Sequence, residues 1–328
     1  MIPGILPGII PARKEKSMSA LLHDPALGSL LTLMGQMFIF ALCGIVLRRK
    51  KILPDQARTI LTDLVMDLIL PANIIHSFEV EFSFSILKRF LLILIIASAA
   101  QAVSMVLAGT LWKRQPANMK RVLQYSTQVS NSGFLGNPVC EGVYGAEGLM
   151  YASVFLIPQR IVMWSAGLAY FTDDPDWKGT LKKVARHPCI IAVYIGIFLM
   201  ITRLPLPDVA QKSLVRLGGC TIPLSMILIG MMMADVDFKT LVSPMVLAVT
   251  AIRLILLPGI TYLGCLFFRI DPLLTGVSVL LVGMPCGSTT PILASKYGGD
   301  YIFASKCVFF STLMSLFSVP LWCMIMGV

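Results

Sequence analysis

Two short polar segments in this sequence contain residues that could bind a negatively charged group. They read Ser130-Asn131-Ser132-Gly133-Phe134-Leu135-Gly136-Asn137-Pro138 and Gly283-Met284-Pro285-Cys286-Gly287-Ser288-Thr289-Thr290-Pro291. Each lies inside a long apolar run, and in a helix interior glycine costs about 1 kcal/mol and proline about 3 kcal/mol. We therefore expect both helices to break there. The second half of a broken helix begins with free N–H groups and a positive dipole end, so a carboxylate could bind near Ser132 and Cys286.

The hydrogen-bond donors in these two segments are neutral. We expect the substrate-binding residues to be Ser130, Asn131, Ser132, Gly133, Asn137, Pro138, Pro285, Cys286, Gly287, Ser288 and Thr289. Neutral amides and hydroxyls suit reversible binding, because a fixed buried charge would hold an anion too tightly for release. The alternative interpretation is that Asn131 and the hydroxyls only satisfy the broken backbone. Both roles can hold together.

Charged side chains inside apolar runs form a second group of candidates, because a charge at membrane depth is costly and commonly functional. Glu141 follows the first segment and either carries a coupling proton or pairs with a structural cation. Gln159 and Arg160 are adjacent in a later run and are candidates to line the path of an anion. Arg253 is expected to neutralise a carboxylate or to extend toward the membrane surface.

No residue is expected to be catalytic, and no metal or other cofactor is expected. The sequence lacks the phosphate-binding Gly-x-x-x-x-Gly-Lys-Ser/Thr loop and the His-Glu-x-x-His and Gly-x-Ser-x-Gly motifs. Its eight cysteines have neither metal nor disulfide spacing, and its carboxylates do not cluster as a sodium site would require. The sequence therefore argues against an ATP-driven pump and against an enzyme.

The composition requires a membrane around the helices that carry these segments. Of 328 residues, 56% are hydrophobic and 13% are charged, whereas soluble proteins have about 25% charged residues. About ten apolar runs, each long enough to cross a bilayer, lie at 28–47, 56–77, 86–112, 120–143, 147–171, 182–202, 209–233, 240–268, 273–295 and 301–327. We expect an all-α polytopic protein of the cell membrane. Its net charge of +10 is then a topology signal, and nucleic acid is not an expected partner.

The loops predict an orientation in the membrane. Lysine and arginine are more numerous in the loops on the side opposite the N-terminus, which include residues 48–51, 113–121 and 178–186. Loops rich in these residues lie in the cytoplasm. Both termini are therefore expected to be extracytoplasmic, and residues 1–27 are expected to form an N-terminal tail.

Matching landmarks in the two halves predict an internal repeat. The second apolar run of each half contains a proline, Pro71 in the first half and Pro223 in the second. A later proline is followed six residues on by Tyr-Gly in both halves: Pro138 by Tyr144-Gly145, and Pro291 by Tyr297-Gly298. The first five-helix repeat is expected at 28–171 and the second at 182–328, with a cytoplasmic linker at 172–181. Because five is odd, the second repeat would enter the membrane from the opposite face. Inverted repeats with broken helices are typical of secondary transporters, which bind substrate near the breaks.

On these residues the sequence resembles the auxin efflux carrier family, which includes plant auxin exporters and bacterial-type malate and malonate permeases. The resemblance covers nearly the whole chain from Gly28 and rests on residues 131–138 with Tyr144-Gly145, on 221–230, and on 284–291 with Lys296-Tyr297. It implies ten transmembrane helices in two inverted five-helix repeats, the bile acid symporter/NhaA-like fold. Helices 1, 2, 6 and 7 would form a scaffold and helices 3–5 and 8–10 a transport domain, in which the broken helices four and nine cross.

The resemblance also implies roles for individual residues. In plant members an asparagine seven residues before a proline helps to bind the substrate carboxylate, and Asn131 with Pro138 has that spacing. Pro285-Cys286-Gly287 matches the Pro-x-Gly of their ninth helix. This chain lacks their long cytoplasmic loop between helices five and six, and it has Ser130 where they have proline. It is therefore more similar to the microbial permeases, and indole-3-acetate is not the expected substrate.

The sequence thus predicts a secondary active transporter or facilitator of a small organic anion, a mono- or dicarboxylate, that works by alternating access around the crossing of helices four and nine. Protons are a candidate coupling ion, and a homodimer is a candidate assembly. One alternative is a cation/proton antiporter of similar fold, which would need an aspartate pair where Asn131 and Cys286 stand. Another is a transporter-like ligand sensor, against which the lack of an attached soluble domain counts.

Overall fold

The computed structural model describes residues 25–79, 83–164, 167, 170–171, 185–234 and 241–328. All regular elements in these ranges are helical, and the one departure is an isolated antiparallel bridge between Ser130 and Cys286. The all-α class predicted from the sequence is confirmed. Residues 1–24 of the expected N-terminal tail and the whole of the expected linker at 172–181 fall outside the described residues, and residues 25–27 of that tail already belong to the first described helix.

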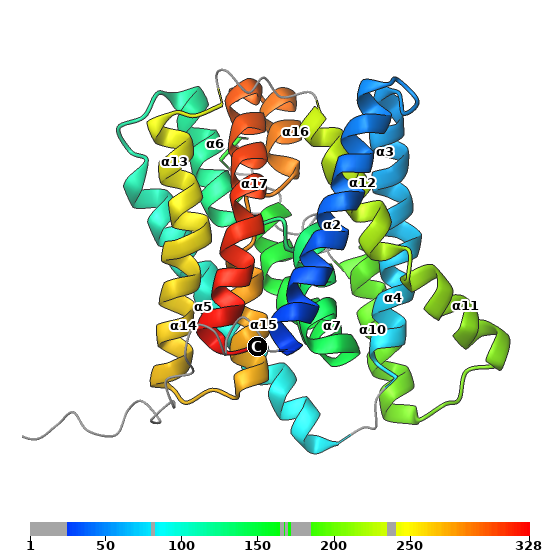
Figure 1. Cartoon of the computed structure of the whole chain (residues 1–328). Helices are drawn as coiled ribbons and strands as arrows, with labels where there is room; N and C mark the ends of the chain where they lie inside the picture. Colours follow the sequence, from blue (N-terminus) through cyan, green and yellow to red (C-terminus); the bar gives the residue numbers. More distant parts are fainter. Residues whose placement is uncertain (1–24, 80–82, 165–166, 168–169, 172–184, 235–240) are drawn as a thin grey trace, which may run out of the picture.

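The helices pack side by side in a bundle (Figure 1). In chain order they are α2 Pro25–Arg49, α3 Asp55–Leu64, η1 Val65–Ile69, α4 Leu70–Ser77, α5 Phe84–Leu111, α6 Ala117–Gln128, η2 Ser132–Gly136, α7 Asn137–Trp164, α10 Pro188–Thr202, α11 Asp208–Gly218, α12 Thr221–Ala234, α13 Pro244–Ala251, η4 Ile252–Leu256, α14 Leu257–Phe267, α15 Pro272–Val282, α16 Thr289–Lys296 and α17 Tyr301–Met326. The three η elements are single π-helical turns: η1 and η4 join the helices on either side of them, and η2 leads directly into α7.

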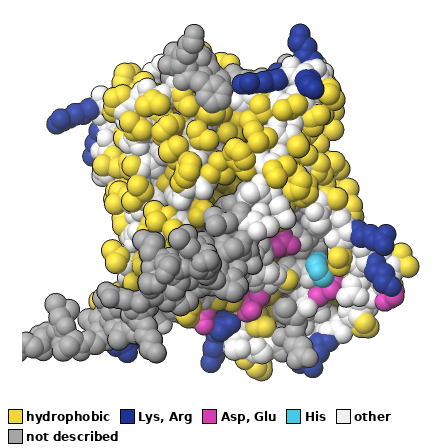
Figure 2. Space-filling view, in the orientation of Figure 1, with side chains coloured by type: hydrophobic (Ala, Val, Ile, Leu, Met, Phe, Trp, Pro, Cys, Tyr) yellow, Lys and Arg dark blue, Asp and Glu magenta, His cyan; other side chains and the backbone are white. Residues whose placement is uncertain are grey.

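The surface of the bundle suits a bilayer. In the described part, five helical stretches are long and apolar enough to cross a membrane: Gln56–Ser77, Phe84–Leu111, Asp208–Met231, Pro244–Phe267 and Tyr301–Met326. Large apolar side chains such as Leu91, Val106 and Leu263 are more than 60% exposed, which a water-soluble surface of this extent would not tolerate. Figure 2 shows apolar side chains over the upper half of the visible face and lysine and arginine toward its ends. These features support a multi-pass membrane protein.

Both helix breaks predicted from glycine and proline are present. The α6 helix ends at Gln128, and helical structure resumes at Ser132. The α15 helix ends at Val282, and α16 begins at Thr289. A further turn separates the fourth and fifth apolar runs at Gly145, whose φ of 66° is a conformation that glycine adopts readily.

Three π-helical turns were not predicted, and each ends two residues before a proline. Proline removes a backbone donor and its ring clashes with the carbonyl four residues earlier. For Pro71, Pro138 and Pro258 that earlier carbonyl lies in η1, η2 or η4, where a wider turn moves it aside. The carbonyl that Pro258 frees, that of Leu254, accepts a hydrogen bond from the Trp322 indole N–H at 2.8 Å. The extra residue of a π turn thus absorbs proline without ending the helix.

The run expected as one helix at 209–233 is instead divided between α11 and α12 at Gly218-Gly219-Cys220. Gly218 is pressed against Asn73 of α4, where a Cβ would stand only 2.6 Å from the amide oxygen. Close approach of the two helices therefore requires a residue without a side chain at this position.

The tightest packing in the bundle joins α2 to α12, which lie side by side in Figure 1. A Cβ placed on Gly44 of α2 would overlap the carbonyl of Ile227, and one placed on Gly230 of α12 would overlap the carbonyl of Ala41. The two backbones therefore touch at reciprocal glycines, an arrangement common where membrane helices associate by close packing.

This contact predicts a sharp difference between two glycine substitutions. Gly230→Ala should lower the free energy of unfolding by roughly 1–3 kcal/mol, because the methyl group has no space. Gly264→Ala, in α14, should be neutral or stabilising by up to about 1 kcal/mol, because nothing lies within 4 Å of its Cβ position and alanine favours a helix. Thermal unfolding of the two purified variants in the same detergent measures the difference. Equal unfolding temperatures would contradict the backbone contact.

Candidate functional site

The two interrupted segments satisfy each other's backbone. The N–H of Asn131 donates to the carbonyl of Pro285 at 2.8 Å, and the N–H of Gly287 donates to the carbonyl of Val129 at 2.9 Å. These bonds form the antiparallel bridge between Ser130 and Cys286. Because a bilayer offers no water to unpaired backbone groups, irregular backbone at this depth needs such partners. The pairing holds the two breaks next to each other.

The buried guanidinium of Arg253 binds the carbonyl ends of both first half-helices. It donates from Nη1 to Thr127 of α6 at 3.1 Å, and from Nη2 to Val282 at the end of α15 at 2.8 Å. Nε and Nη2 also donate to the carbonyl of Met284, at 3.2 and 3.0 Å. The side chain is 2% exposed. The structure therefore corrects the expectation that Arg253 neutralises a carboxylate or reaches the membrane surface: its described partners are backbone carbonyls.

This arrangement leaves the site positive. The carboxyl end of a helix carries a partial negative charge and the amino end a partial positive charge. Arg253 places a permanent positive charge against the carboxyl ends of α6 and α15, so their negative dipole ends are offset. The amino ends of η2 and α16, which begin beside the paired segments, have no such counter-charge among the described residues.

The serine hydroxyls of the first break are engaged in holding the backbone. Ser132 donates to the carbonyl of Leu281 at 2.8 Å, and Ser130 donates to the amide oxygen of Gln159 at 2.9 Å. Gln159 in turn donates from Nε2 to the carbonyl of Ser130 at 2.8 Å. The two serine hydroxyls also contact each other. Gln159 therefore lies at the break, and for the serines the geometry supports the structural interpretation weighed above.

Asn131 is one of several polar side chains near the break whose amides lack a partner among the described residues; Gln128 at the end of α6 is another. Asn131 is 4% exposed. The backbone carbonyl of Asn131 accepts from Leu135 at 3.0 Å and so starts the second half-helix. Asn137, one helical turn further on, is fully buried, and both polar atoms of its amide lack a partner within the described part of the chain.

The remaining candidates of the two segments line the same region. The N–H of Cys286 donates to the Ser311 hydroxyl of α17 at 3.0 Å, and the hydroxyl of Thr289 lies 2.9 Å from that of Tyr125 in α6. Ser288 is 8% exposed and stands immediately before α16. Gly133 has open space around its Cβ position, Pro138 is the second residue of α7, and Pro285 and Gly287 make the backbone pairing.

Glu141 does not lie at the break. It accepts a hydrogen bond from the Nδ2 atom of Asn73 in α4 at 2.8 Å, and the same amide nitrogen lies 3.3 Å from the hydroxyl of Thr221 in α12. Asn73 and Thr221 are almost completely buried. Glu141 thus connects α7 to α4 and α12, and no cation pairs with it among the described residues.

Arg160 is a buried cation near the start of α10. Its Nη1 atom lies 2.7 and 2.9 Å from the two ring nitrogens of His187. The side chain is 6% exposed, and it follows Gln159, which contacts the break. The expectation that Gln159 and Arg160 lie beside an anion path remains a prediction.

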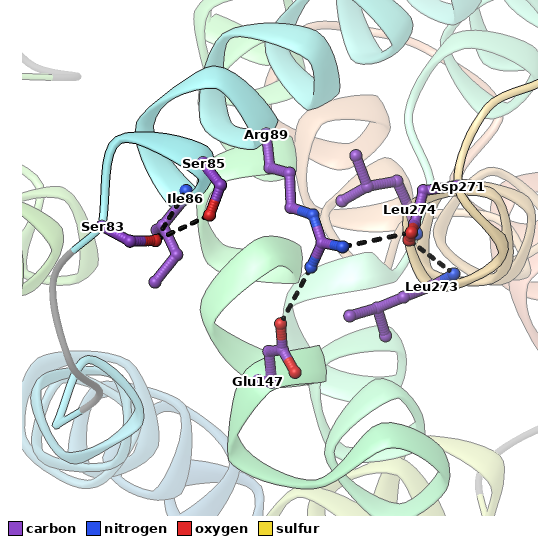
Figure 3. Close-up of polar contacts among 8 residues, drawn as sticks. All are labelled: Ser83, Ser85, Ile86, Arg89, Glu147, Asp271, Leu273 and Leu274. Atoms are coloured by element: carbon purple, nitrogen blue, oxygen red, sulfur yellow. Dashed lines mark hydrogen bonds and ion pairs between the residues drawn. The ribbon is translucent and has the colours of Figure 1, made fainter.

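At one end of the bundle, Arg89 of α5 joins the helices that carry the two breaks (Figure 3). It lies 3.4 Å from Glu147 of α7 and 3.1 Å from Asp271, whose carboxylate caps the first turn of α15. All three side chains are more than one third exposed, so this pair of contacts contributes little stability. Its effect is to align α7 and α15 with α5.

Two features of the site lie beyond the sequence motifs. Arg253 is 31 residues from Met284, and its role becomes visible only when α6, α15 and η4 meet. The sequence signal that could have indicated this role is an arginine in the middle of an apolar run that contains no carboxylate, because such an arginine must find neutral partners. Asn73 carried no signal, because an asparagine near a proline in α4 resembles any helix-packing residue. In the described part of the chain no three His, Cys, Asp or Glu side chains are placed to hold a metal ion.

A small apolar cavity separates α2 and α12 from α7 and α17. Its volume is about 50 Å³, and Met37, Met226, Leu135, Val139 and Val319 are among its lining residues. A space of this size holds at most a few water molecules. In this conformation there is no room for an organic anion between these helices.

The sequence was also compared with known proteins. A family model described as "Membrane transport protein" matches residues 29–176 and 177–323. An uncharacterized transporter of Methanothermobacter thermautotrophicus is 28% identical over 295 residues, which are 88% of this chain and 95% of that protein. An uncharacterized transporter of Methanocaldococcus jannaschii is 24% identical over 294 residues, 87% of this chain and 94% of that protein.

The capping role of Arg253 predicts a graded loss of stability. Arg253→Met should lower the free energy of unfolding by roughly 3 kcal/mol or more, because three buried carbonyl groups lose a charged donor. Arg253→Lys should fall between that variant and wild type, because an ammonium keeps the charge but not the planar fork. Lys306→Met, which removes a half-exposed cation from α17, is the control and should have little effect. Wild-type thermal stability of Arg253→Met would show that the capping bonds are dispensable.

Proposed function

The chain belongs to the membrane transport protein family, that of the auxin efflux carriers, and on this premise we propose that it is a secondary active transporter or facilitator of a small organic anion. The observation that carries the proposal is the pair of broken helices held together by Asn131–Pro285 and Gly287–Val129 backbone bonds. Two helix amino ends begin beside this pairing. They offer partial positive charge to a carboxylate, as in many anion sites.

The charge at the break favours an anion over a cation. Arg253 is a permanent cation bound directly to the broken segments. No described carboxylate makes a hydrogen bond or ion pair there: Glu141 bonds to Asn73, and Glu147 and Asp271 pair with Arg89. A cation/proton antiporter would need acidic ligands in this place. The free amide of Asn131 instead supplies a neutral donor that can hold a carboxylate and release it.

We propose that the architecture is that of two inverted five-helix repeats, 28–171 and 182–328. The scaffold unit would consist of α2, α3, η1, α4, α10, α11 and α12, and the transport unit would contain the remaining helices. In the described part of the chain, two pairs of side chains are hydrogen-bonded across this boundary, Asn73 with Glu141 and Arg160 with His187. The tight α2–α12 contact lies within the scaffold unit, and the paired breaks lie within the transport unit. Neither contact would have to be broken if the units moved relative to each other, which supports such a motion.

Transport would proceed by alternating access, with the transport unit moving against the scaffold unit. The apolar cavity between α2, α12, α7 and α17 is too small for substrate, so substrate entry requires the two units to separate on one side. The substrate would be a mono- or dicarboxylate. Protons are the coupling ion that we propose, and Glu141 is their carrier, because its carboxylate is half-buried at the boundary between the units.

Transport by purified protein in liposomes tests the function. Labelled malate, malonate and indole-3-acetate are offered separately, with and without a pH gradient. We expect uptake of at least one small carboxylate above that of empty liposomes. Exchange of protons for sodium or potassium without any carboxylate uptake would overturn the organic-anion proposal.

Asn131 should be required for transport but not for folding. Asn131→Ala should reduce carboxylate uptake at least about 10-fold, the effect of losing one good polar contact to a charged group. Its unfolding temperature should equal that of wild type, because the amide has no protein partner to lose. Asn118→Ala, which truncates an exposed asparagine at the start of α6, is the matched control. Full uptake by Asn131→Ala at unchanged affinity would remove this residue from the site.

Glu141 should govern the response to pH. In Glu141→Gln the amide cannot release a proton, so a pH gradient should no longer accelerate uptake, whereas exchange of substrate for substrate should continue. Glu147→Gln serves as the control, because it changes an exposed carboxylate on the same helix that pairs with Arg89. If the variant keeps the wild-type response to the gradient, Glu141 has a structural role only.

A further inference from the structure

Arg160 is a buried cation whose described partners carry no negative charge. Its guanidinium lies against the ring of His187, and the Cys189 thiol is within its reach. The Nδ1 atom of His187 accepts a hydrogen bond from the N–H of Cys189 at 3.2 Å, capping α10. A ring nitrogen that accepts is unprotonated, so the imidazole is neutral. A cysteine thiol is also mostly protonated at neutral pH.

Among the described residues, no opposite charge pairs with the guanidinium of Arg160. Arginine stays protonated in proteins, and a buried charge normally has a partner of opposite sign. The ion pairs formed between two described residues, His76–Glu79, Arg89 with Glu147 and Asp271, and Lys212–Asp208, do not involve Arg160. Asp67 in η1 acts electrostatically on Cys189, as Arg160 does, but it is exposed and lies more than 4.0 Å from the guanidinium. The amino end of α10 adds further positive potential at the same place.

The position of Arg160 connects it to the break. Gln159 holds the backbone and the hydroxyl of Ser130, the residue before Asn131. Neighbouring Cα atoms are about 3.8 Å apart, and neighbouring residues on a helix point about 100° apart. Arg160 is therefore beside the break but turned toward α10, across the boundary between the proposed units. A molecule bound at Asn131 that extends toward α10 would meet its guanidinium.

The other two arginines that organise this region have no such capacity. Arg253 donates to three backbone carbonyls, and Arg89 already faces two carboxylates. Among the described residues, Arg160 is thus a buried arginine that lies next to the break and has no negatively charged partner.

We propose that Arg160 binds a second acidic group of the transported molecule, so that this protein prefers substrates with two acidic groups over those with one. The inference rests on the proposed function, because it assumes that the first acidic group binds near Asn131. The second group would replace or join His187 as the partner of the guanidinium, by a charge-assisted and geometrically paired contact.

The test compares acids of equal carbon number that differ in one carboxylate. Binding of succinate, butyrate, malonate and propionate is measured calorimetrically on wild type and variants, and uptake of labelled succinate and butyrate is measured in liposomes. We expect wild type to bind each dicarboxylate at least about 10-fold more tightly than the matching monocarboxylate. Arg160→Gln should weaken succinate binding by a similar factor while changing butyrate binding less than about twofold. Arg269→Gln, which removes an exposed arginine, should change neither.

A second variant keeps the test decisive if Arg160→Gln does not fold. Arg160→Lys retains the charge without the paired donors, so it should lose part of the preference for dicarboxylates and none of the butyrate affinity. The proposal is overturned if wild type shows no preference, or if Arg160 variants weaken both acids equally or neither. Equal losses that Asp67→Asn reproduces, without further loss in the double variant, would assign Arg160 a structural pairing with Asp67. If wild type binds none of the four acids and transports none, the proposed function itself fails.

Discussion

A helix that stops inside a bilayer must find partners for its last carbonyl groups and for the first N–H groups that follow, because no water is present to bind them. This constraint organises the centre of the molecule. The two interrupted segments pair with each other, and Arg253 supplies several donors to the carbonyl ends that remain. The same requirement explains smaller features, such as the Trp322 indole that binds the carbonyl freed by Pro258. The first role of the polar groups in the core is therefore to form hydrogen bonds with backbone groups that the helix breaks leave unpaired.

These hydrogen bonds to the backbone determine which polar groups are still available to bind a ligand. The hydroxyls of Ser130 and Ser132 and the amide of Gln159 are occupied by hydrogen bonds to one another and to backbone carbonyls. The amide of Asn131 has no partner among the described residues, and the helix amino ends beside it have no described counter-charge. Glu141 lies away from the break, where α7 faces α4, and Arg160, beside the break, is turned toward α10. In the proposed site, different side chains would therefore position the backbone and bind the substrate, so that each role can be altered separately.

The sequence predicted the two breaks well, because glycine and proline act locally and their cost in a helix does not depend on the rest of the fold. It also indicated a membrane protein from charge depletion alone. The π-helical turns could not be predicted, since one extra residue before a proline leaves the hydropathy pattern almost unchanged. The partners of Arg253 were missed for a different reason: they are carbonyl groups of three distant segments, and any residue type could have supplied them. The contacts of Glu141 with α4 could not be predicted, because its sequence distance from Pro138 does not show which way the side chain points.

The reciprocal glycines of α2 and α12 have a mechanical consequence. Where two backbones touch, sliding one helix past the other by a single residue would drive a side chain into a carbonyl group. Shear along this contact is blocked, and only separation of the two helices as a whole would release it. The two helices therefore form one rigid body whose register is fixed by backbone contact. In the mechanism proposed above, this pair would be the fixed support against which the transport unit moves.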